Sequence, residues 1–226
     1  MSHATETPAA NSQVAPLRRL GILGGTFNPP HLGHLALARH AREELALDCV
    51  MLMPARLPPH KRPVADPGAA RRLAMCRLLA AREEGVDVSA LELERDGPSY
   101  TVDTLGALHD SYPRTSLTFI LGADVARTLP AWREPHALLA LAELAVALRP
   151  GAAVGDVRAA LAPLLDEARG EARVRFLRMA PLDVSSSLVR ERVQRGEPIA
   201  DLVGPAVAAY VDTEGLYRAP AVEAAS

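Results

Sequence analysis

The chain has 226 residues, of which 49% are hydrophobic and 23% charged, and its formal net charge is −2 at pH 7. This composition is that of a globular protein with a sizeable core, and it excludes wholesale disorder. The near balance of basic and acidic residues leaves no electrostatic footprint for a nucleic acid or an anionic membrane. We therefore expect no nucleic-acid partner and no membrane partner.

The two ends of the sequence differ in composition from the rest. Residues 1–16 are rich in Ala, Thr, Ser and Pro without a basic region and apolar core, so we expect a disordered arm rather than a secretory signal. Residues 219–226 are expected to form a flexible tail, which leaves one domain at 17–218.

No apolar run approaches the ~20 residues of a membrane span. Cys49 and Cys76 lie in apolar patterns and lack the spacing of metal ligands. We expect both to be buried free thiols of a protein in a reducing cytoplasm.

The first candidate site is the run at residues 24–34, GGTFNPPHLGH. The apolar segment 20–23 before it predicts a buried strand, and the pattern from residue 32 to about residue 47 predicts a helix. A strand, a glycine turn and a helix start bind phosphates in α/β sheets, because free N–H groups and the positive end of the helix dipole meet there. His31 and His34 are three residues apart and share one face of the first helical turn.

This run resembles the Gly-x-Phe-x-Pro-x-His-x-Gly-His signature of the nucleotidylyltransferase superfamily, and the spacing fits without a gap. The resemblance implies that backbone groups of the glycine turn cradle ATP phosphates and that two histidines are catalytic, stabilising the α- and β-phosphates. Those residues are Gly24, Gly25, Thr26 and Phe27 for the backbone, and His31 and His34 for the histidines. On local pattern alone, an ordinary strand–helix turn with a surface histidine pair is the alternative. The Gly-x-Gly-x-x-Gly of a dinucleotide-binding oxidoreductase is excluded, because the first two glycines are adjacent and the next is Gly33.

A loop with basic residues follows the next predicted strand, Cys49–Pro54. His60, Lys61 and Arg62 lie there among prolines, at the carboxyl end of a parallel strand, where open α/β sheets bind ligands. Such groups suit an anionic ligand, although a solvated basic loop is equally compatible with the composition.

The middle of the chain predicts further elements. An amphipathic helix is predicted at 68–84 and a short strand at 86–89, and residues 91–95 alternate between apolar and charged side chains. A helix follows to about residue 112, with Ser99 or Thr101 as its N-cap. Its free N–H groups offer a second place for an anion, plain capping being the alternative.

The clearest strand, Leu117–Asp124, brings Asp124 to the ligand edge of the sheet. The single tryptophan, Trp132, lies in an expected loop between a proline and an arginine, which favours a stacking platform over a core anchor. Strands at 144–148 and 174–179 alternate with helices closing at 142 and spanning 154–169. This alternation predicts an α/β fold with a Rossmann-like, doubly wound parallel sheet.

A second phosphate motif is predicted at residues 184–190, VSSSLVR, where three serines open a helix and Arg190 lies one turn inside it. Alone, such a motif indicates a capped helix. It resembles the Ile-Ser-Ser-Thr-x-x-Arg element that contacts the triphosphate in nucleotidylyltransferases, with Val184 in place of Ile and Ser187 in place of Thr. The resemblance implies that Ser186, Ser187 and Arg190 hold ATP and that Arg190 is catalytic. A closing helix is expected at 203–217.

Further segments appear in the order typical of the nicotinate-nucleotide adenylyltransferase family, and the resemblance covers residues 19–218. These segments are 58–61, 98–101, 121–124, Trp132, 149–151 and 215–217. The family reaction joins ATP and nicotinate mononucleotide into nicotinate adenine dinucleotide and pyrophosphate, with Mg²⁺. The resemblance implies that Lys61, Thr101 and Trp132 bind nicotinate mononucleotide. It also implies that Asp124 faces the nucleotide ribose and that no protein side chain needs to act as nucleophile.

Two alternatives remain. A non-catalytic nucleotide-binding module would have no reason to keep both histidines and Arg190 together. A pantetheine-phosphate or nicotinamide-preferring adenylyltransferase would not be expected to combine Trp132 with the Ser-Tyr-Thr segment at 99–101. The resemblance implies small-molecule substrates, and a homo-oligomer is compatible with it. A cytoplasmic location is expected because the sequence shows no secretory signal and no membrane span, and the absence of a carboxylate cluster for metal fits Mg²⁺ held mainly by ATP phosphates and water.

Overall fold

The computed structural model describes residues 17–58, 64–148, 153–167, 174–180 and 182–218. The predicted arm at 1–16, the predicted tail at 219–226 and the predicted ligand Lys61 lie outside the described residues.

Six strands form one sheet in the order β3-β2-β1-β4-β5-β6, and each neighbouring pair is parallel. They are β1 (Arg19–Gly25), β2 (Cys49–Pro54), β3 (Val86–Val88), β4 (Ser116–Gly122), β5 (Ala142–Leu148) and β6 (Val174–Arg178). The chain begins in the centre, builds one half outward to β3, returns to β4 beside β1 and builds the other half. The predicted doubly wound, Rossmann-like sheet is therefore confirmed.

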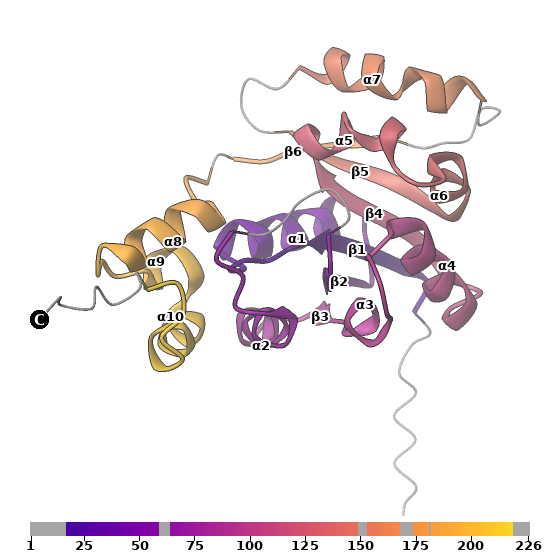
Figure 1. The fold of residues 1–226 in the computed structure, drawn as a ribbon. Coiled ribbons are helices and arrows are strands. Elements are labelled where there is room, and N and C mark those ends of the chain that lie inside the picture. The colour runs from indigo at the N-terminus through magenta and orange to yellow at the C-terminus, as the bar shows by residue number, and fades with distance from the viewer. Residues whose placement is uncertain (1–16, 59–63, 149–152, 168–173, 181, 219–226) are drawn as a thin grey trace, which may run out of the picture.

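Helices cover both faces of the sheet (Figure 1). One face carries α1 (Leu32–Glu44) and α2 (Ala69–Ala80). Beside them, α8 (Ser186–Gln194), α9 (Ala200–Val203) and α10 (Pro205–Thr213) extend the same hydrophobic cluster. The other carries α4 (Thr101–Ser111), α5 (Ala123–Ala126), the 3₁₀ turn η1 (Leu129–Ala131), α6 (Pro135–Leu141) and α7 (Val154–Glu167). The short helix α3 (Leu91–Glu94) lies beside β2.

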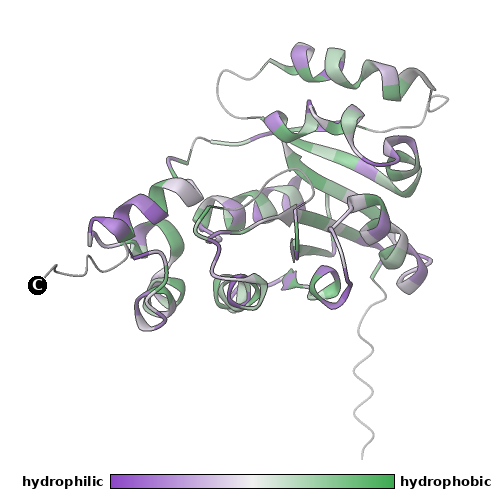
Figure 2. Ribbon diagram, viewed as in Figure 1, coloured by the Kyte–Doolittle hydropathy of each residue, from purple (hydrophilic) through white to green (hydrophobic). Residues whose placement is uncertain are grey.

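Alternation along the strands divides the core into two clusters. Leu20 and Ile22 of β1 point to the α4–α7 side, whereas Leu23 points to the α1–α2 side. Figure 2 shows the hydrophobic sheet between helices that are polar on the outside. Cys76 is buried as predicted, but Cys49 is only partly buried because it begins β2.

The structure differs from the sequence expectations at three places. Residues 91–95, for which no element was predicted, contain the helix α3, whose Glu92 turns inward and accepts a hydrogen bond from Thr104 Oγ1 at 2.7 Å. The closing helix expected at 203–217 is α10, which is shorter at both ends: it follows Gly204, whose φ of +80° does not fit a helix interior, and ends at Thr213, while α9 lies before it. The N-cap of α4 is Tyr100, and Ser99 Oγ instead accepts a hydrogen bond from the Arg56 N–H.

Candidate active site

A cavity of about 1290 Å³ opens at the carboxyl ends of β1 and β4. These two strands are neighbours where the strand order reverses, which is the ligand-binding position of open α/β sheets. The lining includes every sequence-predicted site residue that the structure describes. They are Gly24, Gly25, Thr26, Phe27, His31, His34, Thr101, Asp124, Trp132, Ser186, Ser187 and Arg190.

The glycine turn after β1 is closely packed. A Cβ atom on Gly24 would lie 3.3 Å from the Phe119 ring, and one on Gly25 would lie 3.2 Å from the Phe27 ring. Phe27 adopts φ +51°, a left-handed conformation uncommon for a bulky side chain. The two glycines thus make room for the Phe119 and Phe27 rings, which pack against the turn.

The two histidines at the start of α1 lie against each other. Their rings are stacked with centroids 3.7 Å apart, and the Phe27 ring lies 4.8 Å from that of His34. His31 is buried, and its backbone N–H donates to His34 Nδ1 at 3.2 Å. Because Nδ1 accepts this bond, a neutral His34 carries its proton on Nε2.

Gly33, between the histidines, allows two elements to approach closely. A Cβ atom there would lie 2.9 Å from Val184 Cγ1 and 3.0 Å from His31 Nδ1. The neighbours that approach this glycine are the His31 ring and the segment that leads into α8.

The serine motif is bonded to the glycine turn. Ser185 is the N-cap of α8 and accepts a hydrogen bond from the Leu188 N–H at 3.1 Å. Ser186 Oγ donates to the Pro29 carbonyl at 2.8 Å, and Arg190 Nη2 donates to Ser187 Oγ at 3.1 Å. The two predicted phosphate motifs therefore form one wall of the cavity.

The opposite side of the cavity contains Thr101 and Trp132. The Trp132 indole is half-buried, donates through Nε1 to Thr128 Oγ1 at 3.0 Å and meets the Phe119 ring edge-on at 6.1 Å. The next residue, Arg133, lies over the Tyr100 ring at 4.8 Å. These contacts attach the tryptophan segment to the residues that begin α4.

Asp124 lies in the first turn of α5, after the end of β4. Its carboxylate is exposed and pairs with Arg127 at 2.6 Å. An exposed pair of this kind contributes little to stability, so the carboxylate remains exchangeable toward a ligand. Among the described residues, no group of three or more His, Cys, Asp or Glu is arranged to hold a metal ion.

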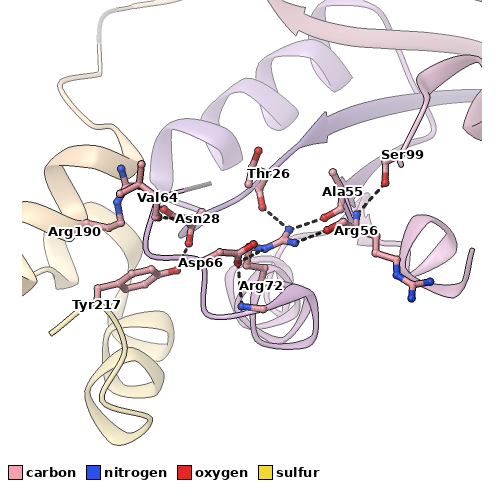
Figure 3. A network of polar contacts seen from close by, with 11 residues as sticks. Thr26, Asn28, Ala55, Arg56, Val64, Asp66, Arg72, Ser99, Arg190 and Tyr217 are labelled. Atoms are coloured by element: carbon pink, nitrogen blue, oxygen red, sulfur yellow. Dashed lines mark hydrogen bonds and ion pairs between the residues drawn. The ribbon is translucent and has the colours of Figure 1, made fainter. Parts of the chain in front are cut away.

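Three residues without a predicted role support the glycine turn (Figure 3). Asn28 is buried; its Nδ2 donates to the Val64 carbonyl at 2.8 Å, and its Oδ1 accepts from the Tyr217 hydroxyl at 2.8 Å. Burial raises the pKa of Tyr217, so the hydroxyl keeps its proton and donates. Arg72 lies beneath the turn, fully buried. One sequence signal could have revealed its burial: Arg72 is four residues before Cys76, on the apolar stripe of the predicted helix.

A buried carboxyl also lines the cavity. Glu92 accepts from Thr104 Oγ1, and desolvation raises the pKa of this carboxyl while the hydroxyls of Thr104 and Ser99 oppose the rise.

No helix in the described part of the chain is long and apolar enough to cross a membrane.

Comparison with known proteins gives consistent matches. The cytidylyltransferase-like family model matches residues 22–192. A probable nicotinate-nucleotide adenylyltransferase from Roseiflexus sp. is 44% identical over 202 residues, covering 88% of this chain and 98% of that protein. A protein of the same description from Desulfitobacterium hafniense is 40% identical over 213 residues, covering 90% and 98%. A solved structure of Plasmodium falciparum nicotinic acid mononucleotide adenylyltransferase complexed with NaAD aligns at 16% identity with a TM-score of 0.71, covering 88% of this chain and 97% of that one, and supports the fold.

Proposed function

This chain belongs to the cytidylyltransferase-like family, and we propose that it is a nicotinate-nucleotide adenylyltransferase. It transfers the adenylyl group of ATP to nicotinate mononucleotide, giving nicotinate adenine dinucleotide and pyrophosphate, as in the biosynthesis of NAD. Both bacterial relatives described above carry that description, and the alignments span nearly their full lengths.

One observation supports this function above the others: a single cavity is lined both by the two predicted phosphate motifs and by Trp132 with Thr101. Its volume of about 1290 Å³ exceeds the roughly 300–1,000 Å³ of a pocket for one drug-sized ligand. Two nucleotides therefore fit with their phosphates meeting near the histidines. Residues 17–218 are the catalytic domain in this proposal, and the reaction takes place in the cytoplasm.

The reaction needs no protein nucleophile, because the 5′-phosphate of the mononucleotide is ionised at neutral pH. One of its oxygens attacks the α-phosphorus of ATP in line, and the bond to the bridging oxygen of pyrophosphate breaks. The protein positions the two phosphates and stabilises the negative charge that shifts to pyrophosphate.

The phosphate wall supplies the donors for this step. The backbone of residues 24–27 cradles the phosphates, while His31 and His34 face the α- and β-phosphates. His34 donates through Nε2–H, since its Nδ1 already accepts the His31 N–H. Ser186, Ser187 and Arg190 hold the triphosphate.

The mononucleotide occupies the other side of the cavity. Trp132 stacks on the pyridine ring, and Thr101, at the first turn of α4, offers an N–H to the carboxylate of nicotinate. Asp124 faces a nucleotide ribose. Lys61 completes this set as a phosphate ligand and belongs to a segment outside the described residues.

Mg²⁺ enters this proposal as the ion that accompanies ATP. In the described lining of the cavity, Glu92 is buried against Thr104 and Asp124 pairs with Arg127, so the two carboxylates do not converge. This donor set fits an ion held mainly by phosphate oxygens and water. When bound, the ion neutralises charge on the phosphates.

The test is pyrophosphate release with ATP and Mg²⁺, offering nicotinate mononucleotide and nicotinamide mononucleotide in parallel. The expected result is turnover with strong preference for the acid, because N–H donors at the start of α4 favour a carboxylate over a neutral amide. Equal rates with nicotinate and nicotinamide mononucleotide would show that the enzyme accepts both substrates. No turnover with either substrate would overturn the proposed function while leaving the fold unaffected.

A further inference from the structure

Arg72 is the largest fully buried side chain in the described part of the molecule, with 0% of its surface exposed. Its guanidinium donates to three main-chain carbonyls and one carboxylate (Figure 3). The acceptors are the carbonyls of Thr26 at 2.8 Å, Ala55 at 2.7 Å and Arg56 at 3.2 Å, and Asp66 Oδ1 at 2.9 Å. Burying a charged group is costly unless its donors find partners. These acceptors engage four of the five N–H groups of the guanidinium.

The position of these acceptors connects Arg72 to the cavity. Thr26 follows β1 in the glycine turn, whereas Ala55 and Arg56 directly follow β2. Asp66 precedes α2 and also accepts a hydrogen bond from the Gly68 N–H. A single side chain thus holds the ends of two neighbouring strands and the segment that enters α2.

Two successive peptide groups of the glycine turn have fixed carbonyls. The Gly25 carbonyl accepts from the Ala55 N–H at 2.9 Å, and the Thr26 carbonyl accepts from Arg72. In a trans peptide the C=O and the following N–H point in opposite directions. Both carbonyls point toward the end of β2, so the N–H groups of Thr26 and Phe27 point away from it. Both residues line the cavity.

The charge of Arg72 adds to this effect. A guanidinium bonded to the Thr26 carbonyl polarises that peptide group, and a polarised peptide is a stronger donor at its N–H. The Phe27 N–H belongs to the same peptide group. Its residue is also held at φ +51°, a conformation that persists only when its surroundings fix it.

We propose that Arg72 is a positioning residue of the phosphate site: by holding the Thr26 carbonyl together with the carbonyls at the end of β2, it directs the Thr26 and Phe27 N–H groups at substrate phosphate. Arg72 itself does not touch the substrate. This inference rests on the proposed function, because it assigns the source of the donor orientation in that same site.

The first experiment compares Arg72→Lys with Arg71→Lys, the same substitution at the preceding residue of α2. Arg71 is exposed and pairs with Glu214 at 3.2 Å, outside the cavity lining. A lysine at 72 keeps the charge but cannot supply the planar set of donors. At a temperature where circular dichroism shows both variants folded, we expect kcat of Arg72→Lys to fall at least about tenfold, because small misplacements at a reacting centre can cost about 10²-fold. Arg71→Lys should match the unmodified protein.

A role in stability alone predicts a different result. In that case Arg72→Lys would melt at a lower temperature, while the folded enzyme would keep its kcat and its KM for ATP, and the inference would be overturned. An unmodified protein that releases no pyrophosphate at all would overturn the proposed function instead. The two failures are therefore distinguishable.

A second measurement needs no variant, so it remains available if Arg72→Lys does not fold. In ¹H–¹⁵N spectra of the unmodified protein, α,β-methylene-ATP should shift the amide resonances of Thr26 and Phe27, whereas adenosine, which lacks phosphates, should not. The absence of a phosphate-dependent shift at both amides would overturn the inference.

Discussion

Arg190 Nη1 donates a hydrogen bond of 2.7 Å to the main-chain oxygen of Asn28, a residue 162 positions earlier in the chain. Asn28 also accepts the Tyr217 hydroxyl and donates to Val64, so the glycine turn is connected to α8, to the residues after α10 and to the segment before α2. The same guanidinium reaches Ser187 Oγ. Arg190 thus joins the two phosphate motifs and at the same time lines the cavity.

Replacing Arg190 by lysine should lower kcat/KM for ATP by about 10²-fold, since a lysine ammonium cannot bond the Asn28 carbonyl and a phosphate with the same planar geometry. Steady-state kinetics with ATP varied would measure the change. Arg192→Lys is the matched control, because Arg192 lies on the same helix and pairs with Asp201 instead. Equal effects of the two substitutions would remove Arg190 from the phosphate site.

His34→Ala should lower kcat by about 10²-fold or more with the fold intact, the size expected for loss of one transition-state donor. The donor in question is the Nε2–H of His34. Its Nδ1 accepts the backbone N–H of His31, so the proton of the neutral ring is on Nε2. His40→Ala, on the same helix but outside the cavity lining, should retain activity. An unchanged kcat in His34→Ala would exclude this histidine from the mechanism.

Trp132→Ala should raise KM for nicotinate mononucleotide by roughly 5- to 150-fold and leave KM for ATP nearly constant, because base–aromatic stacking contributes ~1–3 kcal/mol per ring. Trp132→Phe should recover most of the loss, since a phenyl ring still offers a stacking face. Kinetics with each substrate varied in turn would separate the two KM values. If both rise together, the indole acts by packing on Phe119 rather than by stacking on substrate.

The pH dependence of stability should reveal Glu92. Burial raises the pKa of this carboxyl above its ordinary value of 4.5, so the folded protein holds the proton at pH values where the unfolded chain has released it. Stability therefore falls as pH rises from 4.5 through the folded-state pKa. Glu92→Gln lacks this titration, so its Tm relative to the unmodified protein should increase between pH 4 and pH 7. A Tm difference that is constant with pH would show that Glu92 titrates normally.

Local patterns predicted the strands and the two motifs well, because a buried parallel strand is a short apolar run and a phosphate-binding turn needs glycine and a helix start close together. The second motif lies against the first as a family resemblance implied, yet no local pattern shows that Ser186 bonds Pro29. The closing helix was predicted too long at its end, because Leu216 and Tyr217 are apolar and buried although they lie in a turn after Thr213.

The supporting residues were missed for another reason. Arg72 resembles a surface arginine by type, and only the fold shows that three carbonyls converge on its guanidinium. Asn28 lies inside the first motif, but its supporting role could not be predicted because its hydrogen-bond partner, Tyr217, lies 189 residues away in the sequence. Sequence reasoning identified residues that face the cavity, and long-range contacts determine which residues hold them in place.

The contacts of Asn28 also bear on the order in which the molecule folds. Its bonds to Arg190 and Tyr217 close loops of 162 and 189 residues, and such contacts form only after the chain entropy of those loops has been lost. The sheet around β1 and β2 depends on far shorter loops. On refolding, the secondary structure of the N-terminal half should therefore return before the phosphate site does, and a chain interrupted before Tyr217 would have its sheet without a fully secured glycine turn.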